Sequence, residues 1–582
     1  MLRTPNQPPI LVLVGDESPN RFAGYVAEML RVEGLNWFDV SPALPDAPPA
    51  LVLAAATDID GPTAGRIAAH VRAGGSLLAC RPGPALLRAL DLPPAPPLRD
   101  GWADRYVMLD PGSPVAQNLP WVEGGVQFFG RPLAFATAPD RPDPRVVACV
   151  APFPGQRSRY AAVTAQTIGA GRAVLFAFDP AESIVRQQQG RPQQASTGPL
   201  ADFDGDGTYR PNDLFFGQLD VALRDVPQAD LQRTLLIRAV EWLTERQPVP
   251  RLWRFPRGAA AGALFDGDSD AMDVQDFRNV LEVCDRHGAP FATYLKPESL
   301  AVVDAAEATA ARARGHSFGP HPWAGPTPTV AALRDALDAN CAAFAAKYGY
   351  RPRLHRGHWL VWPGWVDHAR SLQAAGIQLD ANFTAGYGFK GGYVNGTGLP
   401  ARFVDEAGRL LDVYEQSTIS TDDGWLTPKG GLPAMTLAEA ISRSCAMIDA
   451  AADRYHTVFH PYFHPRPLSG GGAIPYPTRP WLDAALAHAK RRGLPYLDAE
   501  HWLDWNAARR SVSLTALRRV HTGVECTLHA DRAIHGLSVL IPLPHGTEGE
   551  HVVHRHGRPY ATATVDLRAG ETATVTLPLP GA

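Results

Sequence analysis

The sequence predicts an α/β protein of three domains: an N-terminal domain with a parallel sheet, a central distorted (β/α) barrel and a small C-terminal β-sandwich. The chain has 582 residues, enough for three or four domains at roughly 150 residues each. Short apolar runs alternate with runs of helical periodicity up to about residue 508. Beyond that point only short β-type runs separated by turn residues remain, which is typical of a sandwich.

The first domain is expected over residues 1–250. Apolar runs at 10–14, 50–56 and 76–80 alternate with helical runs, a pattern that indicates right-handed crossovers and a parallel sheet. Later runs, among them 160–168, extend the sheet. The prolines of the segment QPVPRLWRFPRG break the periodicity near residue 250 and mark the boundary. An acidic loop over 186–225 is an insertion in this domain.

The second domain is expected over 251–508 and the third over 509–582. Strands and helices alternate through the second domain, and its loops on one edge are rich in His, Asp and Trp. In a (β/α) barrel such loops at the carboxyl ends of the strands carry the site. The last domain contains six short β runs.

Composition excludes several classes of function. The 55 basic and 59 acidic residues give a net charge of −4, so no global field favours nucleic acid or an anionic membrane. The six cysteines form no CxxC pair, which argues against a disulfide framework or a thiolate zinc site. The N-terminal apolar run is too short for a signal peptide, so we expect a cytoplasmic protein, or a secreted one if a leader is missing. The sequence leaves the oligomeric state open.

Histidines and carboxylates gather in the second domain. Asp266, Asp268 and Asp270 follow a strand at a spacing of two, which places them on one face if the chain stays extended. Such a cluster is either a hydrated acidic loop or the carboxylate part of a metal and general-base pair, because like charges this close repel unless a cation intervenes. Further polar positions follow in chain order: His316, His321, His355, Arg356, His358, Asp380, His456, His460 and His464.

In that order these positions resemble the motifs of the polysaccharide deacetylases, the NodB-homology group of carbohydrate esterase family 4. The segment 265–268, Phe-Asp-Gly-Asp, is similar to the first motif, which implies that Asp266 is the catalytic base and Asp268 a metal ligand. The segment 315–321 is similar to the second motif and implies a ligand at His321.

The later motifs of the family resemble later segments of the chain. Arg356 is similar to the arginine that orients the base, and 380–383 to the fourth motif. The segment 457–460 is similar to the fifth motif, a strand that ends in His. A cleaved amide leaves as an amine and needs a general acid, for which His460 is the first choice and His464 the second. One position departs from the pattern, since the family's second metal-binding His falls on Gly325.

A divalent metal needs three protein ligands and an open position. With Gly325 unable to bind, His358 is the expected substitute and His464 the next choice. The predicted centre is therefore zinc or a similar ion on Asp268, His321 and His358. The rival interpretation is that the metal site has decayed.

The resemblance implies a hydrolase that removes an acetyl group, through a C–N amide bond, from an N-acetylated saccharide. Two alternatives stay open: a catalytically lapsed carbohydrate-binding protein and a metal-independent amidohydrolase of the same fold. Aromatic faces in a cleft stack on sugar rings, so a subset of the region's many aromatics is expected to bind substrate. The predicted substrate contacts are Trp323, Trp359, Asp380 and Tyr462.

Two further features lie in the first domain. Its pattern resembles the glutamine-amidotransferase-like α/β fold, with Cys80 on the turn where the nucleophile would fall, but the partner His is missing, which favours a scaffold or binding module. The inserted loop fits the template D-x-D-x-D-G of a calcium loop, or is an acidic surface turn. Its candidate calcium ligands are Asp202, Asp204, Asp206, Thr208 and Asp213.

Overall fold

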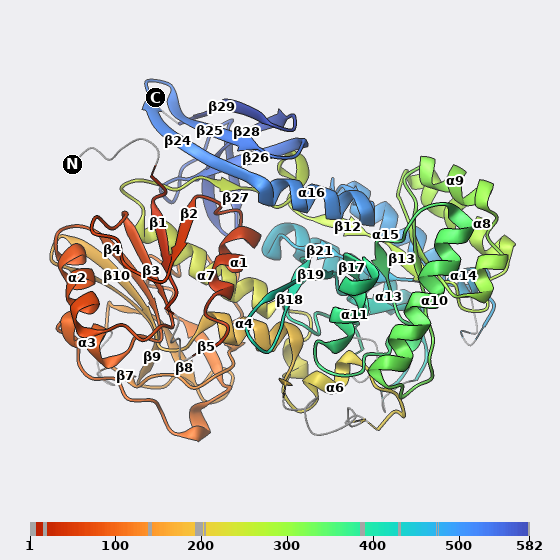
Figure 1. Cartoon of the computed structure of the whole chain (residues 1–582), viewed down its shortest axis with the longest axis horizontal. Coiled ribbons are helices and arrows are strands. Elements are labelled where there is room, and N and C mark those ends of the chain that lie inside the picture. The colour runs from red at the N-terminus through yellow and green to blue at the C-terminus, as the bar shows by residue number, and fades with distance from the viewer. Residues whose placement is uncertain are drawn as a thin grey trace. The chain divides into compact units, whose positions relative to one another are not determined.

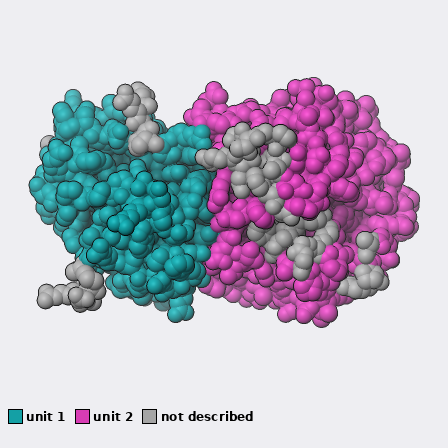
Figure 2. Space-filling view, turned by 90° about the horizontal axis from the view of Figure 1, so that it is seen from below, with its two compact units in different colours: residues 1–187, 231–258, 505–582 teal, residues 188–230, 259–504 magenta. Residues whose placement is uncertain are grey.

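The structure is a computed structural model that describes residues 7–15, 20–137, 143–192, 202, 205–384, 390–428, 432–472, 474 and 477–579. The chain divides into two compact units, coloured separately in Figure 2. The first unit comprises 1–187, 231–258 and 505–582, and the second comprises 188–230 and 259–504. The insertion expected in the first domain therefore packs with the second unit. The C-terminal β segment packs with the first.

The first unit is built on a ten-stranded sheet. Along its path the strands are β2 (Phe38–Ser41), β1 (Ile10–Leu13), β3 (Leu51–Ala55), β4 (Ser76–Cys80), β10 (Gly171–Phe176), β9 (Tyr160–Ile168), β8 (Val146–Ala151), β5 (Tyr106–Leu109) and β6 (Val126–Gln127), and β7 (Phe135–Ala136) pairs with β9. The half from β2 to β10 is parallel, as predicted. The other half is antiparallel. The two residues 169 and 170 that join β9 to β10 explain the change, since so short a connection can only form a hairpin.

Helices cover this sheet because its strands are apolar on both faces. Helices α2 (Gly61–Arg72) and α3 (Pro84–Ala89) lie on one side of it, and α1 (Tyr25–Val32) and α7 (Gln228–Leu243) on the other (Figure 1). Helix α2 begins where the Asp60 side chain accepts a hydrogen bond from the Thr63 amide at 2.6 Å, a standard N-cap.

Burial, followed by repulsion from Asp179, raises the pKa of the Cys80 thiol well above its ordinary value. The thiolate that a nucleophile requires is therefore disfavoured.

The C-terminal segment of the first unit forms two antiparallel sheets. One contains β24 (Val512–Val520), β25 (Gly523–Ala530) and β29 (Glu571–Pro578), and the other contains β11 (Arg251–Leu252), β26 (Ile534–Pro542), β28 (Arg558–Leu567) and β27 (Val552–Arg555). Their inward residues share one hydrophobic cluster, which includes Cys526, Leu528, Val539 and Ile541. The six predicted β runs are all strands.

The second unit is built mainly on parallel strands. They are β12 (Gly262–Leu264), β13 (Asp266–Asp268), β14 (Ala292–Leu295), β15 (Ser317–Pro320), β16 (Leu354–His355), β17 (Leu379–Asp380), β19 (Leu410–Glu415), β20 (Ser420–Thr421), β21 (Val458–Phe459), β22 (Pro461–Tyr462) and β23 (Tyr496–Leu497), with β18 (Ala401–Val404) antiparallel to β19. Strand β13 lies between β14 and β22, and β22 lies beside β20. The carboxyl ends of these neighbours meet at one edge.

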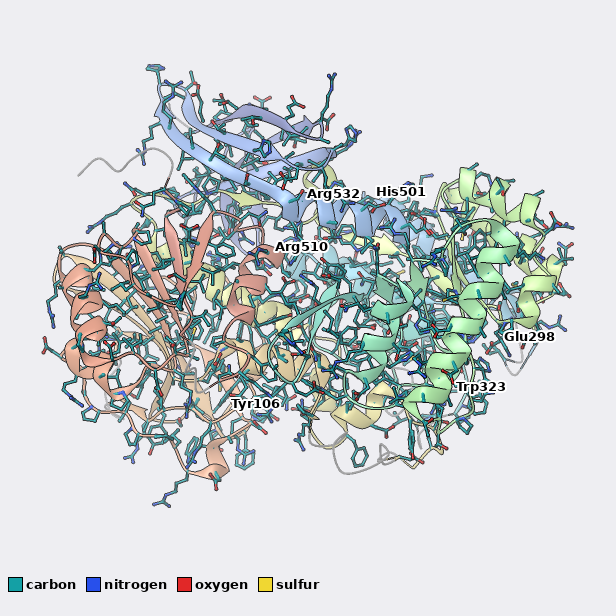
Figure 3. The ribbon with its side chains drawn as sticks, viewed as in Figure 1. Tyr106, Glu298, Trp323, His501, Arg510 and Arg532 are labelled. Atoms are coloured by element: carbon teal, nitrogen blue, oxygen red, sulfur yellow. The ribbon has the colours of Figure 1, made fainter. Side chains whose placement is uncertain are left out.

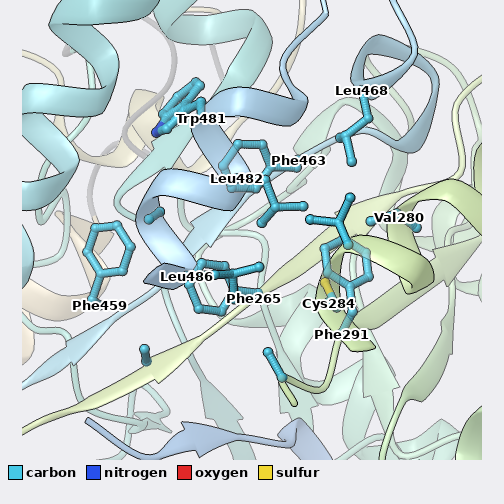
Figure 4. Close-up of a cluster of buried hydrophobic side chains, with 14 of the residues drawn as sticks. Phe265, Val280, Cys284, Phe291, Phe459, Phe463, Leu468, Trp481, Leu482 and Leu486 are labelled. Atoms are coloured by element: carbon cyan, nitrogen blue, oxygen red, sulfur yellow. The ribbon is translucent and has the colours of Figure 1, made fainter. Parts of the chain in front are cut away.

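Helices and an apolar core support this edge. The main ones are α8 (Val274–His287), α10 (Val330–Tyr348), α13 (Leu437–Ala450) and α15 (Arg479–Arg491). Helix α8 begins at a capping box formed by Asp273 and Asp276 and ends at Gly288, whose φ is 70°. Phe265, the residue between β12 and β13, packs in the same core cluster as Leu482 and Leu486 of α15 (Figure 4).

In the part of the chain that the structure describes, no helix has the length and apolar character needed to cross a membrane.

Candidate metal centre and its cavity

Two carboxylates of the acidic run, Asp266 and Asp268, lie in β13, and Asp270 follows the strand by two residues. Asp266 and Asp268 point to one side, as a spacing of two requires, and both contact the guanidinium of Arg356, at 3.0 and 3.2 Å. Gly267 lies between them, and a Cβ at this position would stand 1.7 Å from the carbonyl oxygen of Phe463. Only glycine allows β13 to approach the neighbouring chain this closely.

Arg356 is fixed on every side. Its Nη1 and Nη2 donate to the two oxygens of Asp266 at 3.0 and 2.7 Å, and its Nε donates to the carbonyl of Ala381 at 2.9 Å. The guanidinium also stacks between the rings of Tyr294 and Tyr462, 4.6 and 4.5 Å from their centroids. A cation held this rigidly sets the position of the carboxylates that it contacts.

Asp266 is fully buried, and both of its oxygens take part in hydrogen bonds with Arg356 or His460. Burial alone would raise the pKa of its carboxyl, but Arg356 and then His460 outweigh burial and lower it below its ordinary value. His460 Nε2 lies 2.8 Å from an Asp266 oxygen, and His460 Nδ1 lies 3.2 Å from the carbonyl of Ser417.

Asp270, His321 and His358 form a cluster whose ligand atoms all lie within 4.8 Å of one another. An Asp270 oxygen is 3.0 Å from His358 Nδ1 and 3.5 Å from His321 Nε2, and these two nitrogens are 3.2 Å apart. His321 Nδ1 donates to the carbonyl of Arg356 at 2.7 Å, which leaves the Nε2 lone pair directed at the cluster. A carboxylate and bare imidazole nitrogens at this spacing suit a divalent cation such as zinc.

The three groups of the cluster change one another's ionisation. Burial would raise the pKa of Asp270, but His321 and His358 together lower it far below its ordinary value. Burial would lower the pKa of His321, and Asp268 with Asp270 raises it instead. For His358 burial prevails and lowers the pKa, which favours the neutral imidazole that a metal binds.

Asp268, the carboxylate predicted as a ligand, lies beside this cluster. One of its oxygens is 3.2 Å from Arg356 Nη1, and the other is 3.5 Å from His321 Nε2. The geometric cluster contains Asp270 in its place. Both residues belong to the acidic run that the sequence singles out, but a spacing of two puts them on one face and does not decide between them.

His464 and Asp422 form a second pair that faces the same space. His464 Nδ1 donates to Asp422 at 2.7 Å, and His464 Nε2 lies 3.0 Å from the Tyr462 hydroxyl and 3.9 Å from Asp270. Burial would lower the pKa of His464, but Asp422 outweighs it and the pKa rises to about 10. Together with Asp423 these two residues form the other group able to hold an ion in the described part of the chain. Sequence reasoning missed both aspartates, which lie about forty residues before the histidine.

A cavity of about 340 Å³ lies beside these groups, and Asp268, Asp270, Asp423 and His464 line it, whereas His321 and His358 do not. Its lining consists of Asp206, Thr208, Arg210, Asp268, Asp270, Trp359, Leu360, Thr421, Asp423, Tyr462 and His464. Asp266, His460 and Asp380 do not line it. Asp380 is fully buried, and its carboxylate accepts a hydrogen bond from His355 Nδ1 at 2.7 Å, so the predicted substrate contact does not fit its position.

One tryptophan, Trp359, lines the cavity, and a second, Trp323, packs against it. Trp359 is 47% exposed, and its φ of 57° is a left-handed conformation that is uncommon for an aromatic residue. Arg210 of the inserted loop donates from Nε to the carbonyl of Trp359 at 2.9 Å and thereby supports it. Trp323, labelled in Figure 3, meets Trp359 and His358 edge to face, with both ring centroids 4.9 Å away.

The candidate calcium loop uses its carboxylates within the chain. Asp202 accepts hydrogen bonds from the amides of Asp206 and Gly207, and Asp206 accepts from the Thr208 amide and is ion-paired with Arg210. Asp213 is fully buried and caps α6 (Pro211–Phe215). Asp204 lies outside the described residues. Calcium binding at this loop stays a prediction.

Gly325, where the resemblance would require a second histidine, has a φ of 95°, and a Cβ there would meet no heavy atom within 4 Å. The backbone therefore favours glycine at this position. His358 reaches the cluster from the loop after β16 instead, and this places it against His321.

No model of a known protein family matches the sequence, and neither does the sequence of any curated protein. Among the solved structures that it resembles is Agd3, described as a novel carbohydrate deacetylase, at 11% identity and a TM-score of 0.40 over 98% of both chains. A family 4 acetyl xylan esterase from Clostridium thermocellum, with a cobalt ion, matches at 16% identity and a TM-score of 0.26 over 42% of this chain and 90% of that one.

A pseudoenzyme of carbohydrate esterase family 4 from Bacillus anthracis matches at 11% identity and a TM-score of 0.26, over 43% of this chain and 66% of that one. The solved structures thus include active and inactive proteins. The residues of the chain itself, and not these similarities, carry the function proposed for it.

Proposed function

We propose that the protein is a metal-dependent hydrolase that removes an acetyl group from an N-acetylated saccharide by cleaving the C–N amide bond. The observation that carries this proposal is the convergence of Asp270, His321 and His358 within 4.8 Å at a polar cavity. A carboxylate held by Arg356 stands on one side of that cluster, and a histidine held by Asp422 stands on the other.

The proposed metal ligands are Asp270, His321 and His358, with zinc as the expected ion. Three nitrogen and oxygen ligands with a fourth position open to a cavity are the usual composition of a catalytic zinc site. When bound, such an ion supplies Lewis acidity and a water that loses its proton near neutral pH. His321 is held in the binding tautomer by its hydrogen bond to the Arg356 carbonyl.

The proposed general base is Asp268. It lines the cavity, and its contact with Arg356 Nη1 at 3.2 Å keeps it in place. The resemblance implies Asp266 for this role, but both oxygens of Asp266 are engaged by Arg356 and His460 away from the cavity. We assign Asp266 the task of positioning Arg356, and thereby Asp268.

The proposed general acid is His464, the second choice from the sequence. An amide that is cleaved must leave as an amine, which needs a proton at the nitrogen. His464 lines the cavity, and Asp422 holds its ring and keeps it protonated at neutral pH. His460 is less suited to this task because it does not line the cavity.

A single sugar residue is the proposed occupant of the cavity. Its volume of about 340 Å³ lies at the lower end of the range for small-ligand sites. Trp359 offers an exposed aromatic face for stacking, and Thr208 lines the cavity with a hydroxyl group for the sugar's polar edge. Tyr462 also lines the cavity, and its hydroxyl lies 3.0 Å from His464 Nε2.

Acetate release from a panel of N-acetylhexosamine oligomers, with and without a chelator, tests the proposal. Release that the chelator abolishes and added zinc restores is the expected result. Release that the chelator leaves intact would instead identify a metal-independent amidohydrolase. No release from any oligomer, combined with binding of the same oligomers, would identify a lapsed enzyme that binds carbohydrate.

A further inference from the structure

A second large cavity lies in the first unit and is made only of residues of that unit. Its volume of about 610 Å³ lies well within the range of small-molecule sites. One wall is apolar and continuous with the core of the two C-terminal sheets, and the other carries guanidinium groups. The residues that matter below are Trp37, Leu543, Leu579, Arg246, Arg519 and Arg558.

The charged lining of this cavity is predominantly cationic. Arg246, Arg519 and Arg558 all line it, whereas the single acidic residue of the lining is Glu245. Glu245 is already paired with Arg172 at 2.8 Å. Arg519 is exposed and makes no ion pair with any residue that the structure describes. A lining that combines apolar side chains with guanidinium groups suits a ligand with an apolar body and an acidic group.

A buried excess of positive charge lies behind Arg558. Arg558 is 9% exposed, and its Nη1 lies 3.2 Å from Glu241, which also binds Arg251 at 3.2 Å. The guanidinium of Arg238 lies near those of Arg558 and Arg251 and makes no ion pair with any carboxylate that the structure describes. Because arginine stays protonated in proteins, Arg238 leaves a buried positive charge close to Arg558.

Arg238 also has buried hydrogen-bond donors that lack acceptors. It is 1% exposed, and its Nη2 donates to the carbonyl of His556 at 2.6 Å. Its Nε and Nη1, like the Nε of Arg558, are buried and have no hydrogen-bond partner among the residues described. Burial lowers the pKa of Arg238, and the nearby Arg558 and Arg251 lower it further. Buried donors without acceptors are costly, and a bound anion beside them removes part of that cost.

We propose that this cavity binds a small organic anion, with its carboxylate or phosphate group at Arg558 and its apolar body against Trp37 and Leu543. The excess charge around Arg238 favours the anion electrostatically, and Arg519 and Arg246 flank the same space. The proposal concerns the first unit alone. It adds a ligand site that is independent of the metal cluster, all of whose residues belong to the second unit.

Isothermal titration of the full chain with three naphthalene derivatives tests this site. 1-Naphthoate, 1-naphthyl phosphate and 1-naphthalenemethanol share one apolar body and differ in the polar group. We expect the anions to bind at least about tenfold more tightly than the alcohol, as one charge-assisted hydrogen bond implies. The tighter of the two anions identifies the acidic group. Equal affinity for the alcohol and the anions, or no binding of any probe, overturns the proposal.

Variants locate the binding. Arg558→Met should abolish the preference for anions. It also removes one ion-pair partner of the buried Glu241 and is therefore expected to destabilise the protein. Arg519→Met, at an exposed position, avoids that difficulty and should weaken both anions severalfold while leaving the alcohol unchanged. Arg157→Met is the control, because Arg157 is an exposed arginine that does not line the cavity. Unchanged anion affinity in Arg519→Met overturns the proposal even if Arg558→Met does not fold.

Discussion

Asp422 accepts two hydrogen bonds from His464, one from the ring Nδ1 at 2.7 Å and one from the backbone amide at 2.8 Å. The pair fixes the orientation of the imidazole and turns its Nε2 toward Tyr462 and Asp270. A histidine held by a buried carboxylate at the edge of a polar cavity is well suited to deliver a proton to a leaving group. This pair and the groups around it lead to specific expectations for single substitutions.

Asp422→Asn should lower kcat by about 10²–10⁴, the range for loss of general acid catalysis, and leave KM nearly unchanged. The reason is that His464 loses the negative charge that keeps it protonated. Steady-state kinetics of acetate release measures the effect. Asp449→Asn is a matched control, because Asp449 makes a similar contact with His488 outside the cavity. Equal loss in both variants would count against the assigned role.

Asp268→Asn should reduce activity, and Asp266→Asn should reduce stability. Asp268→Asn removes the proposed base and should lower kcat by about 10²–10⁴ while the fold remains stable. Asp266→Asn disturbs the buried ion pair with Arg356 and should lower the free energy of unfolding by about 3–5 kcal/mol. Denaturant unfolding and single-turnover kinetics on both variants separate the two roles. A stable, inactive Asp266→Asn together with an active Asp268→Asn would restore Asp266 as the base.

Trp359→Ala should raise KM several-fold with little change in kcat, because an exposed stacking surface binds ground state and transition state alike. The free energy of unfolding should change by less than about 1 kcal/mol, since the side chain is 47% exposed. Phe153→Ala, at an aromatic residue of the other unit that is 65% exposed, is the control and should leave KM unchanged. A lower kcat with constant KM would exclude a purely binding role for Trp359.

Glu33 predicts a pH dependence of stability. Burial would raise its pKa, but Arg254, Arg251 and Arg233 outweigh burial and lower it. A carboxyl whose folded pKa is depressed stabilises the protein fully above its unfolded pKa of about 4.3, and this contribution is lost as the pH falls through the folded value. Glu33→Gln should therefore cost about 3–5 kcal/mol at pH 7 and progressively less below about pH 4.3.

Chemical denaturation of wild type and Glu33→Gln across the pH range measures this difference. Glu245→Gln is the matched control, because its ion pair with Arg172 is exposed and should contribute less than about 1 kcal/mol at any pH. A cost for Glu33→Gln that stays constant from about pH 7 to about pH 3 would contradict the assigned ionisation.

Much of the fold could be predicted from local pattern. Strand β13 and helices α8 and α10 follow from apolar runs and helical periodicity, and the C-terminal strands follow from short β runs between turns. The antiparallel half of the first sheet was not predicted, because the hairpin between β9 and β10 depends on a connection of two residues. The packing of the insertion with the second unit depends on long-range contacts, such as Arg210 with Trp359, that local pattern does not contain.

The candidate site was predictable in composition and not in detail. The order of the motifs brought His321, His358 and Arg356 to one edge, because the carboxyl ends of parallel strands meet there. The choice between Asp268 and Asp270 as the metal ligand depends on where β13 ends, and the spacing of two residues does not show where that is. The preference for His464 over His460 depends on Asp422, which reaches His464 only through the pairing of β20 with β22.

Metal content is the most direct test of the central claim that Asp270, His321 and His358 hold a divalent ion. Protein purified without a histidine tag should contain close to one equivalent of zinc or a similar ion by mass spectrometry. His321→Ala and Asp270→Asn should lose that ion, and Asp268→Asn should retain it. An ion that persists in His321→Ala, or that is lost in Asp268→Asn and kept in Asp270→Asn, would contradict this assignment.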